Sequence, residues 1–187
     1  MVMIVVVGVI LLRTSVMGVV YVQSGSMLPN VQKGDGIIIN HLSFGMNLPF
    51  QDRLAYQWAL PKRGDMITFH NPLDDEELWL KRVMGLPGDK LEFRDHRLYL
   101  NGMDIQPGKR GKEHLPVSGQ DGLNYHIWHS YLELDWGPTM IPENSLFLMG
   151  DNRGNSEDSR SWGSVHRKHL QGQAILRFWP LSRFGLL

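Results

Sequence analysis

The first 22 residues are apolar almost throughout, and the pattern changes once they end. The stretch MVMIVVVGVILLRTSVMGVVYV has its polar and charged side chains at Arg13, Thr14 and Ser15. About 20 apolar residues are enough for one helix to cross a bilayer. We therefore predict a single transmembrane anchor over residues 1–22. Two other interpretations stay open, which are a cleaved signal peptide and a buried strand of a soluble domain.

After the apolar stretch, short runs of apolar and β-branched residues alternate with turns. Four Gly-Asp pairs border such runs: Gly34-Asp35 before GIIIN, Gly64-Asp65 before MITFH, Gly88-Asp89 before KLEF, and Gly150-Asp151 after SLFLM. Gly and Asp are typical turn residues, and β-branched runs between turns are typical of strands. The pattern therefore predicts a mainly β fold.

Three further segments refine this picture. In ELWLKRVMGLPGDKL, alternation places Trp79 and Lys81 on the same strand face, with Lys81 in mid-strand. The segment KLEFRDHRLYLNG predicts a hairpin that turns at residues 95–96 and again at 101–102. A closing strand is predicted in GQAILRFWP. Residues 41–61 are predicted to form a long surface loop with a short helical possibility over 52–60.

Charge and composition exclude several classes of protein. The 187 residues carry 19 basic and 19 acidic side chains, so bulk electrostatics do not indicate a nucleic-acid partner. The absence of cysteine excludes disulfides, thiolate catalysis and cysteine-ligated metals. The histidine pairs 126/129 and 166/169 lack a third ligand or an HExxH pattern, so we expect no metal and no cofactor.

Candidate chemistry lies in two polar stretches. Ser24-Gly25-Ser26-Met27-Leu28-Pro29 follows the apolar segment directly, and we select Ser26 as the candidate nucleophile. Positions 150–161 contain no aliphatic side chain, so this loop must be held by polar contacts. Either stretch alone is also typical of an ordinary linker or loop.

Five blocks together resemble the type I signal peptidases, which are membrane-bound serine proteases with a Ser/Lys dyad. They are SGSMLP (24–29), KGD (33–35), KRGDMITF (62–69), LKRVMGLPGDK (80–90) and GDNRGNSEDSRSWG (150–163), in the family's order. The resemblance implies a coiled β-sheet catalytic core related to the repressor-type proteases. It divides the chain into an anchor (1–22), a catalytic β core (23–92 and 143–187) and an inserted β subdomain (93–142).

The resemblance also implies a role for each matching residue. Ser26 would be the nucleophile, Lys81 its general base, and Ser24 an oxyanion-hole donor beside the Ser26 backbone N–H. Ser156 would orient the lysine. Supporting roles would fall to Asp158, Arg160, Asp151 and Arg82, and the shallow apolar substrate pockets would be lined by Val22, Met27, Val31, Ile37, Trp79 and Leu80. Gln23 departs from the family's frequent proline, and the insertion is short and free of cysteine.

A lysine acts as a base only when it is uncharged, and at its ordinary pKa roughly one in 2,500 is neutral at pH 7. Burial among Leu78, Leu80 and Val83 would lower that pKa. A carboxylate touching Lys81 would raise it again. We therefore predict that Asp151 and Asp158 pair with arginines. Met27 and the aliphatic pocket residues have ordinary core packing as their alternative interpretation.

The resemblance implies removal of signal peptides from exported preproteins that carry small residues at positions −1 and −3. It places a single-pass, monomeric enzyme at the bacterial inner membrane with its catalytic domain on the outer face, and Trp58, Phe178 and Trp179 are candidates to enter the lipid surface. Two alternatives remain: a specialised relative such as a conjugative-pilus maturation peptidase, and an inactive membrane-anchored assembly protein. A repressor-type protease would need a DNA-binding domain, for which the chain has neither room nor charge.

Overall fold

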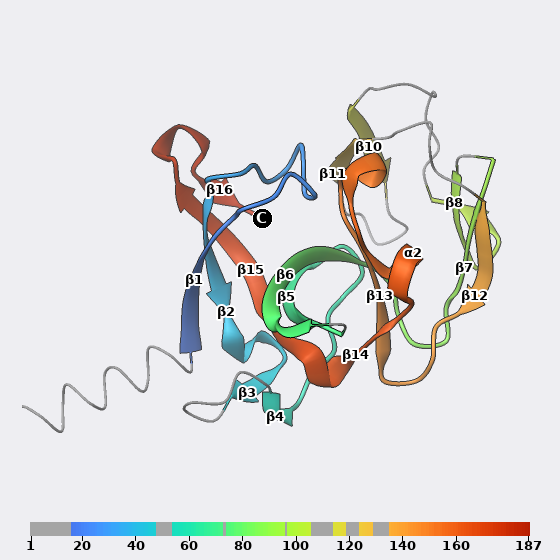
Figure 1. Cartoon of the computed structure of the whole chain (residues 1–187), viewed down its shortest axis with the longest axis horizontal. Helices are drawn as coiled ribbons and strands as arrows, with labels where there is room; N and C mark the ends of the chain where they lie inside the picture. The colour runs from blue at the N-terminus through green and yellow to red at the C-terminus, as the bar shows by residue number, and fades with distance from the viewer. Residues whose placement is uncertain are drawn as a thin grey trace, which may run out of the picture.

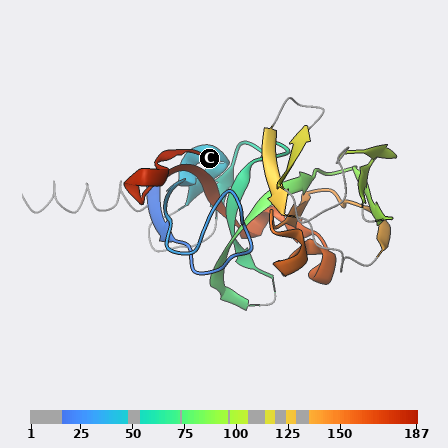
Figure 2. The ribbon, with the colours of Figure 1, turned by 90° about the horizontal axis from the view of Figure 1, so that it is seen from above.

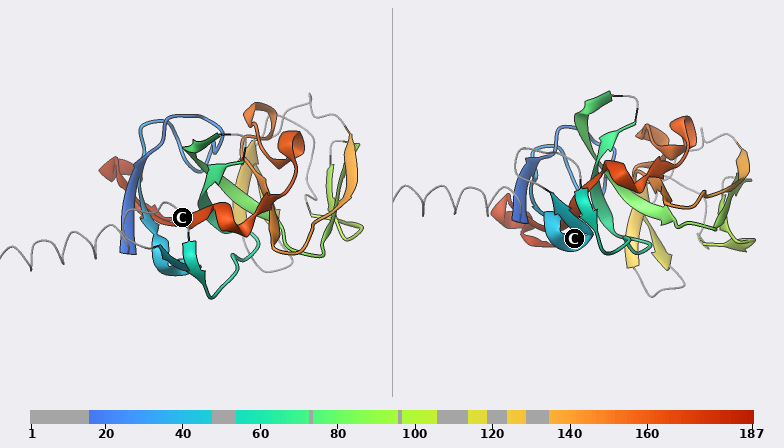
Figure 3. Two further views of the ribbon diagram at one scale, coloured as in Figure 1. Left: turned by 60° about the horizontal axis from the view of Figure 1, so that its bottom comes forward. Right: turned by 90° about the horizontal axis from the view of Figure 1, so that it is seen from below.

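The computed structural model describes residues 16–47, 54–72, 74–95, 97–105, 114–118, 124–128 and 135–187. The fold is mainly β, as predicted, and its strands pair in antiparallel fashion (Figure 1). The two views in Figure 3 show the green strands β5 and β6 crossing the middle of the molecule. Strand β6 carries Lys81, the predicted general base.

Within the described residues the main sheet has eight strands, in the order β1-β2-β15-β5-β6-β13-β14, with β16 paired to β15. The bounds are β1 Met17–Tyr21, β2 Gly36–Asn40, β5 Met66–Asn71, β6 Asp74–Gly85, β13 Ser145–Met149, β14 Val165–His166, β15 Leu170–Trp179 and β16 Gly185–Leu186. All of the strands predicted for the core are therefore present.

A second sheet, ordered β12-β7-β8-β9, forms the opposite end of the molecule from β1 (Figure 1). Its strands are β7 Lys90–Arg94, β8 Arg97–Leu100, β9 Met103–Asp104 and β12 Trp136–Met140. The pairing of β7 with β8 confirms the predicted hairpin. A separate pair, β10 His114–Ser118 with β11 Asn124–Trp128, projects to one side in Figure 2. The second sheet begins at Lys90, while the division at residues 92 and 93 stays a prediction.

Three of the Gly-Asp pairs form the same turn. The glycine has positive φ in each, at 92°, 91° and 83° for Gly34, Gly64 and Gly88. The aspartate that follows accepts the backbone N–H of the residue three positions earlier, in the pairs Asp35–Gln32, Asp65–Lys62 and Asp89–Leu86. Each turn thus combines a backbone conformation that favours glycine with a carboxylate that satisfies the turn.

The N-terminal prediction is wrong in its last part. Residues 17–21 form strand β1, which pairs along its length with β2 from Met17–Asn40 to Tyr21–Gly36. The β-branched Val19 and Val20 favour this extended conformation, and β2 supplies the hydrogen-bonding partner. The predicted span over residues 1–15 lies outside the described residues. Within the part of the chain that is described, no helix combines the length and apolar character needed for a membrane crossing.

Residues 41–61 also differ from the prediction. They contain the short helix η1 (His41–Ser43) and a hairpin of β3 (Gly45–Asn47) with β4 (Leu54–Gln57), so the helical possibility is wrong at 54–57. Gly45 explains the pairing, because a Cβ there would lie 2.1 Å from the Tyr56 carbonyl oxygen. The strands approach closely only where that side chain is missing.

The central strands are buried on both faces. On β13, Phe147 and Met149 enter one apolar cluster, while Leu146 and Leu148 enter another. A third cluster, which contains Met27, Val31, Ile37, Ile39, Met66 and Ala174, lies under the loop that follows β1. The remaining short helices are η2 Arg153–Asn155, α2 Ser159–Trp162, η3 Arg167–His169 and η4 Leu181–Arg183.

Candidate active site

The structure brings Ser26 and Lys81 together. Ser26 lies in the loop between β1 and β2, drawn in blue in Figure 1, and Lys81 lies in the middle of β6. The Lys81 Nζ is 2.9 Å from the Ser26 Oγ. Only 8% of Ser26 and 4% of Lys81 is exposed, so the contact is shielded from water. Their spacing is short enough for direct proton transfer between hydroxyl and amine.

Lys81 is held by its strand in an apolar environment. Its β6 position pairs with Ile67 of β5, and the neighbouring Leu80 packs on the third apolar cluster. Burial lowers the pKa of Lys81 to about 8, and the negative charges of Asp158 and Glu157 limit that decrease. At such a pKa roughly one lysine in ten is neutral at pH 7, about two hundred times more than for an ordinary lysine. The amine is therefore suited to act as a base.

The predicted pairing of the acids with arginines is confirmed for Asp151. Its side chain is fully buried and receives the Arg82 guanidinium through two bonds, from Nε at 2.7 Å and Nη2 at 2.6 Å. Two parallel charge-assisted bonds neutralise this carboxylate in place. Arg82 is the residue after Lys81, so the acid is satisfied without contacting the amine of Lys81.

Asp158 shows the same arrangement with Arg160, whose Nε and Nη2 lie 2.8 and 2.9 Å from its two oxygens. Burial acts to raise the pKa of Asp158, but the bonds from Arg160 and from the Gly150 N–H outweigh burial and lower it. The polar loop is thus held by polar contacts, as its composition predicted. Asp158 also begins α2 by accepting the Arg160 backbone N–H at 3.2 Å.

Ser24 lies beside the candidate nucleophile, with its Oγ 3.2 Å from the Ser26 Oγ. Ser24 is exposed, whereas Ser26 is buried. Among the described residues, the backbone N–H of Ser26 has no acceptor. The Ser24 hydroxyl and the backbone N–H of Ser26 are donors of the types that form an oxyanion hole.

Ser156 is placed differently from its expected role. Its hydroxyl donates to the Glu157 carbonyl at 3.4 Å and helps to lower the pKa of Asp158 through a side-chain hydrogen bond. No hydrogen bond joins it to Lys81 within the described residues. Its Oγ instead lies against Gly150, where an added Cβ would be 2.2 Å from it and 2.6 Å from the Ser26 carbonyl oxygen.

The six predicted pocket residues divide by exposure. Met27, Val31 and Ile37 are almost fully buried in the third apolar cluster, on which Val22 and Leu80 pack while keeping part of their surface exposed. Trp79 packs on Trp162 with ring centroids 4.9 Å apart, and the Lys81 Nζ lies 4.9 Å from the Trp79 ring. Of the six, Trp79 therefore contacts the candidate base directly, while the others belong to or pack on the third cluster.

Two asparagines of the site were not found by sequence reasoning. Asn152 donates its backbone N–H to the Ser26 carbonyl at 2.9 Å and its side-chain amide to the Gly25 carbonyl at 3.0 Å. Asn30 donates its side-chain amide to Asp151 at 2.7 Å. Their position in polar loops was visible in the sequence, but nothing in the sequence paired the two loops. As for metals, no cluster of three potential ligands occurs in the described part of the chain.

Comparison with known proteins gives the family of this chain. The profile of the family described as signal peptidase, peptidase S26, matches residues 1–179. The signal peptidase I of Leptolyngbya laminosa is 33% identical over 184 residues, covering 94% of this chain and 75% of the relative. That of Pseudomonas fluorescens is 34% identical over 211 residues, covering 96% and 74%. A crystal structure of a signal peptidase I from Enterococcus faecalis V583 is 30% identical, covers 62% of this chain and 97% of that chain, and has a TM-score of 0.43. Because the family profile matches almost the whole length, this chain belongs to the signal peptidase family, peptidase S26.

Proposed function

We propose that this chain removes N-terminal signal peptides from exported preproteins, with Ser26 as nucleophile and Lys81 as its general base. The proposed activity is supported by membership of the family and by the relatives named signal peptidase I. The choice of the two residues is supported by the distance of 2.9 Å between the Ser26 Oγ and the buried Nζ of Lys81. The proposed reaction needs no nucleophile or base besides these two residues.

In the proposed reaction, the Ser26 Oγ attacks the scissile carbonyl carbon while neutral Lys81 takes the hydroxyl proton. The Ser24 hydroxyl and the Ser26 N–H donate to the oxygen that becomes negative. The peptide C–N bond then breaks, and Lys81 gives its proton to the leaving amine. Water repeats the sequence on the acyl-enzyme, with Lys81 as base again, and releases the signal peptide.

The remaining residues support this reaction. We assign to the Arg82–Asp151 and Arg160–Asp158 pairs the role of keeping carboxylates away from the amine of Lys81. Ser156 keeps a supporting role, which its contact with Gly150 and its bond to Asp158 favour over direct contact with the lysine.

Substrate choice follows from the apolar surroundings of the dyad. Val22, Leu80 and Trp79 retain exposed surface, and the buried Met27, Val31 and Ile37 lie behind them. Because the third cluster is filled by its own side chains, we propose that the subsites above it are shallow and suit small side chains at positions −1 and −3. We propose alanine-sized residues at both positions.

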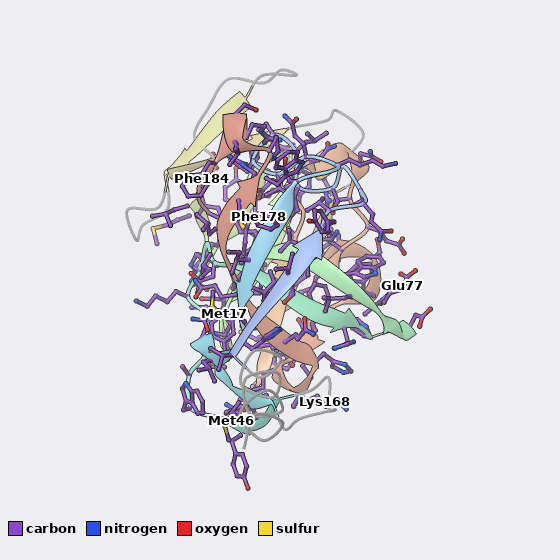
Figure 4. The ribbon with its side chains drawn as sticks, turned by 90° about the vertical axis from the view of Figure 1, so that its left-hand side faces the viewer. Met17, Met46, Glu77, Lys168, Phe178 and Phe184 are labelled. Carbon is purple, nitrogen blue, oxygen red and sulfur yellow. The ribbon has the colours of Figure 1, made fainter. Side chains whose placement is uncertain are left out.

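An exposed apolar face supports membrane binding. On the edge strand β1, alternate side chains face outward, with Met17, Val19 and Tyr21 exposed. The C-terminal end adds Trp179, Leu181, Phe184 and Leu186, and the β3–β4 region adds Met46, Tyr56, Trp58 and Leu60. Figure 4 looks onto the side of β1 and labels Met17, Met46, Phe178 and Phe184, with the charged Glu77 and Lys168 at its edge. Among the three lipid candidates, Trp58 and Trp179 are more than half exposed and Phe178 is half-buried against Tyr21.

Exposed aromatic and aliphatic side chains of this kind suit contact with a lipid surface. We propose a monomeric enzyme that is anchored once through the apolar segment that precedes β1, with its catalytic domain on the outer face of a bacterial inner membrane. That position places Ser26 beside signal peptides that arrive within the bilayer.

A cleavage assay on a preprotein with alanine at −1 and −3 tests the dyad. Ser26→Ala and Lys81→Ala should each abolish cleavage, while the matched controls Ser43→Ala and Lys90→Ala should not. Retained activity in Ser26→Ala would refute the assignment. A wild-type chain that cleaves no preprotein would favour an inactive assembly protein, and one that cleaves only a pilin precursor would favour the maturation peptidase.

A further inference from the structure

Two arginines, Arg177 and Arg183, hold the loop that carries Ser26 through contacts other than the one with Lys81. Arg183, at the end of η4, directs its Nη1 to both carboxylate oxygens of Asp35, at 2.9 and 3.0 Å. Its Nη2 donates to the Asn30 carbonyl at 3.2 Å. Asp35 is only 2% exposed, so this ion pair is largely shielded from water.

Both acceptors belong to the loop of residues 24–35. Within it, Val31 donates to the Met27 carbonyl at 2.9 Å, and the Asp35 carbonyl accepts the Val22 N–H at 2.9 Å. The loop is thus closed at its base by Asp35, and Arg183 ties that base and the middle of the loop to the C-terminal segment. In Figure 1 this blue loop lies beside the red C-terminal end.

Arg177 of β15 fixes Arg183 in turn. Its Nη1 donates to the Asn30 carbonyl, and its Nε donates to the Arg183 carbonyl. Because β15 is an inner strand of the main sheet, paired with β2 and β5, this support is rigid. The Asn30 carbonyl therefore receives two guanidinium groups, one from the sheet and one from η4.

Asn30 connects these two arginines to the other half of the site. Its side-chain amide donates to the Asp151 Oδ2 at 2.7 Å, and Asp151 is paired with Arg82, the neighbour of Lys81. A continuous set of hydrogen bonds thus runs from Arg183 through Asn30 and Asp151 to strand β6. The loop of the nucleophile and the strand of the base are held to a common frame.

We propose that Arg183 is a positioning residue for signal-peptide hydrolysis, which holds the 24–35 loop so that Ser26 stays within reach of Lys81. The inference rests on the Ser26–Lys81 dyad proposed above. A small displacement of a reacting group costs rate far more than it costs binding. A loosened loop would also admit water to Lys81, whose low pKa depends on burial.

The test compares Arg183→Met and Arg183→Lys with Arg97→Met in the full-length protein in detergent or lipid. Arg97 pairs with Asp104 at 2.6 Å in the second sheet, so its replacement also removes an ion pair. For Arg183→Met we expect kcat to fall by about 10- to 100-fold with KM changed less than about threefold. The ascending limb of the pH–kcat profile should move to higher pH. Arg183→Lys should recover part of kcat, and Arg97→Met should keep it.

A folded Arg183→Met enzyme with kcat within about twofold of wild type would overturn the inference, as would an equal loss of kcat in Arg97→Met. If Arg183→Met does not fold, Arg183→Lys decides by the same measures, since an unchanged kcat in that variant overturns the inference too. The Ser26–Lys81 dyad is tested separately, because an active Ser26→Ala enzyme would refute it whatever the Arg183 variants show. An inactive Ser26→Ala with an unaffected Arg183→Met rejects only the role of Arg183.

Discussion

Asn152 donates its backbone N–H to the carbonyl oxygen of Ser26 at 2.9 Å, which ties the loop of the nucleophile to the polar loop that follows β13. Gly150 lies at the same contact and leaves no room for a side chain between the Ser26 carbonyl and the Ser156 hydroxyl. The position of Ser26 is therefore set partly by a loop distant in sequence.

Gly150→Ala should separate these two loops. The added Cβ would meet the Ser26 carbonyl oxygen at 2.6 Å, so the backbone on one side must shift. We expect kcat to fall by about 100-fold, because displacement of a reacting group by about 1 Å has that effect. Gly154→Ala, at an exposed position of the same polar loop, is the control. Equal activity of both variants would show that the contact has no bearing on catalysis.

Activity should rise with pH through a midpoint near 8. Lys81 is catalytically competent when neutral, and its pKa of about 8 places most of the amine in the charged form at lower pH. The rate should then fall about tenfold for each pH unit well below the midpoint. Measurement of kcat/KM against pH on a peptide without titrating groups checks this. An ascending limb centred near 10 would mean that the amine is not desolvated.

Lys81→Met should stabilise the protein. The pKa of Lys81 is lower in the folded state than in the unfolded chain, because burial disfavours the charged amine. The charged lysine therefore destabilises the fold, and this cost is fully present below about pH 8, where the amine is charged in both states. The shift corresponds to a cost of about 3 kcal/mol at pH 7, which disappears as pH rises toward about 10.4. Urea unfolding of wild type and variant at pH 7 and pH 10 measures it. A variant less stable than wild type at pH 7 contradicts the prediction.

Ser24→Ala should lower kcat by about two to three orders of magnitude, because one side-chain donor to an oxyanion is worth about 2.7–4 kcal/mol. KM should change little, since the oxyanion forms only after substrate has bound. Ser24→Thr keeps the hydroxyl and serves as the comparison. Steady-state kinetics that show equal kcat for Ser24→Ala and wild type would remove Ser24 from the site.

Trp58 and Trp179 should contact lipid. With the full chain in vesicles that contain brominated phospholipid, their fluorescence should be quenched, because both indoles are more than half exposed. Trp58→Phe and Trp179→Phe should each reduce the quenched fraction. Trp162→Phe should not, because Trp162 packs against the core beside Trp79. Quenching that is independent of Trp58 and Trp179 would place both side chains away from the bilayer.

Much of the fold was accessible from local pattern. The Gly-Asp turns and the β-branched runs depend on backbone preferences of neighbouring residues, so the core strands and the β7–β8 hairpin were predicted correctly. The mid-strand position of Lys81 followed from the same alternation. The errors fell at residues 17–21 and 54–57, where an apolar or mixed segment became a strand because β2 or β3 was available as a partner.

The sequence by itself determined the strand pattern, the two polar stretches and, through the resemblance, the residues Ser26 and Lys81. Only the tertiary structure decided how close they lie, which arginine satisfies each acid, and that Asn30, Asn152 and Arg183 make the contacts that hold the 24–35 loop. Those contacts join segments far apart in the chain, so no local preference specifies them. They arise when the antiparallel sheet brings the segments together and burial makes each polar group find a partner.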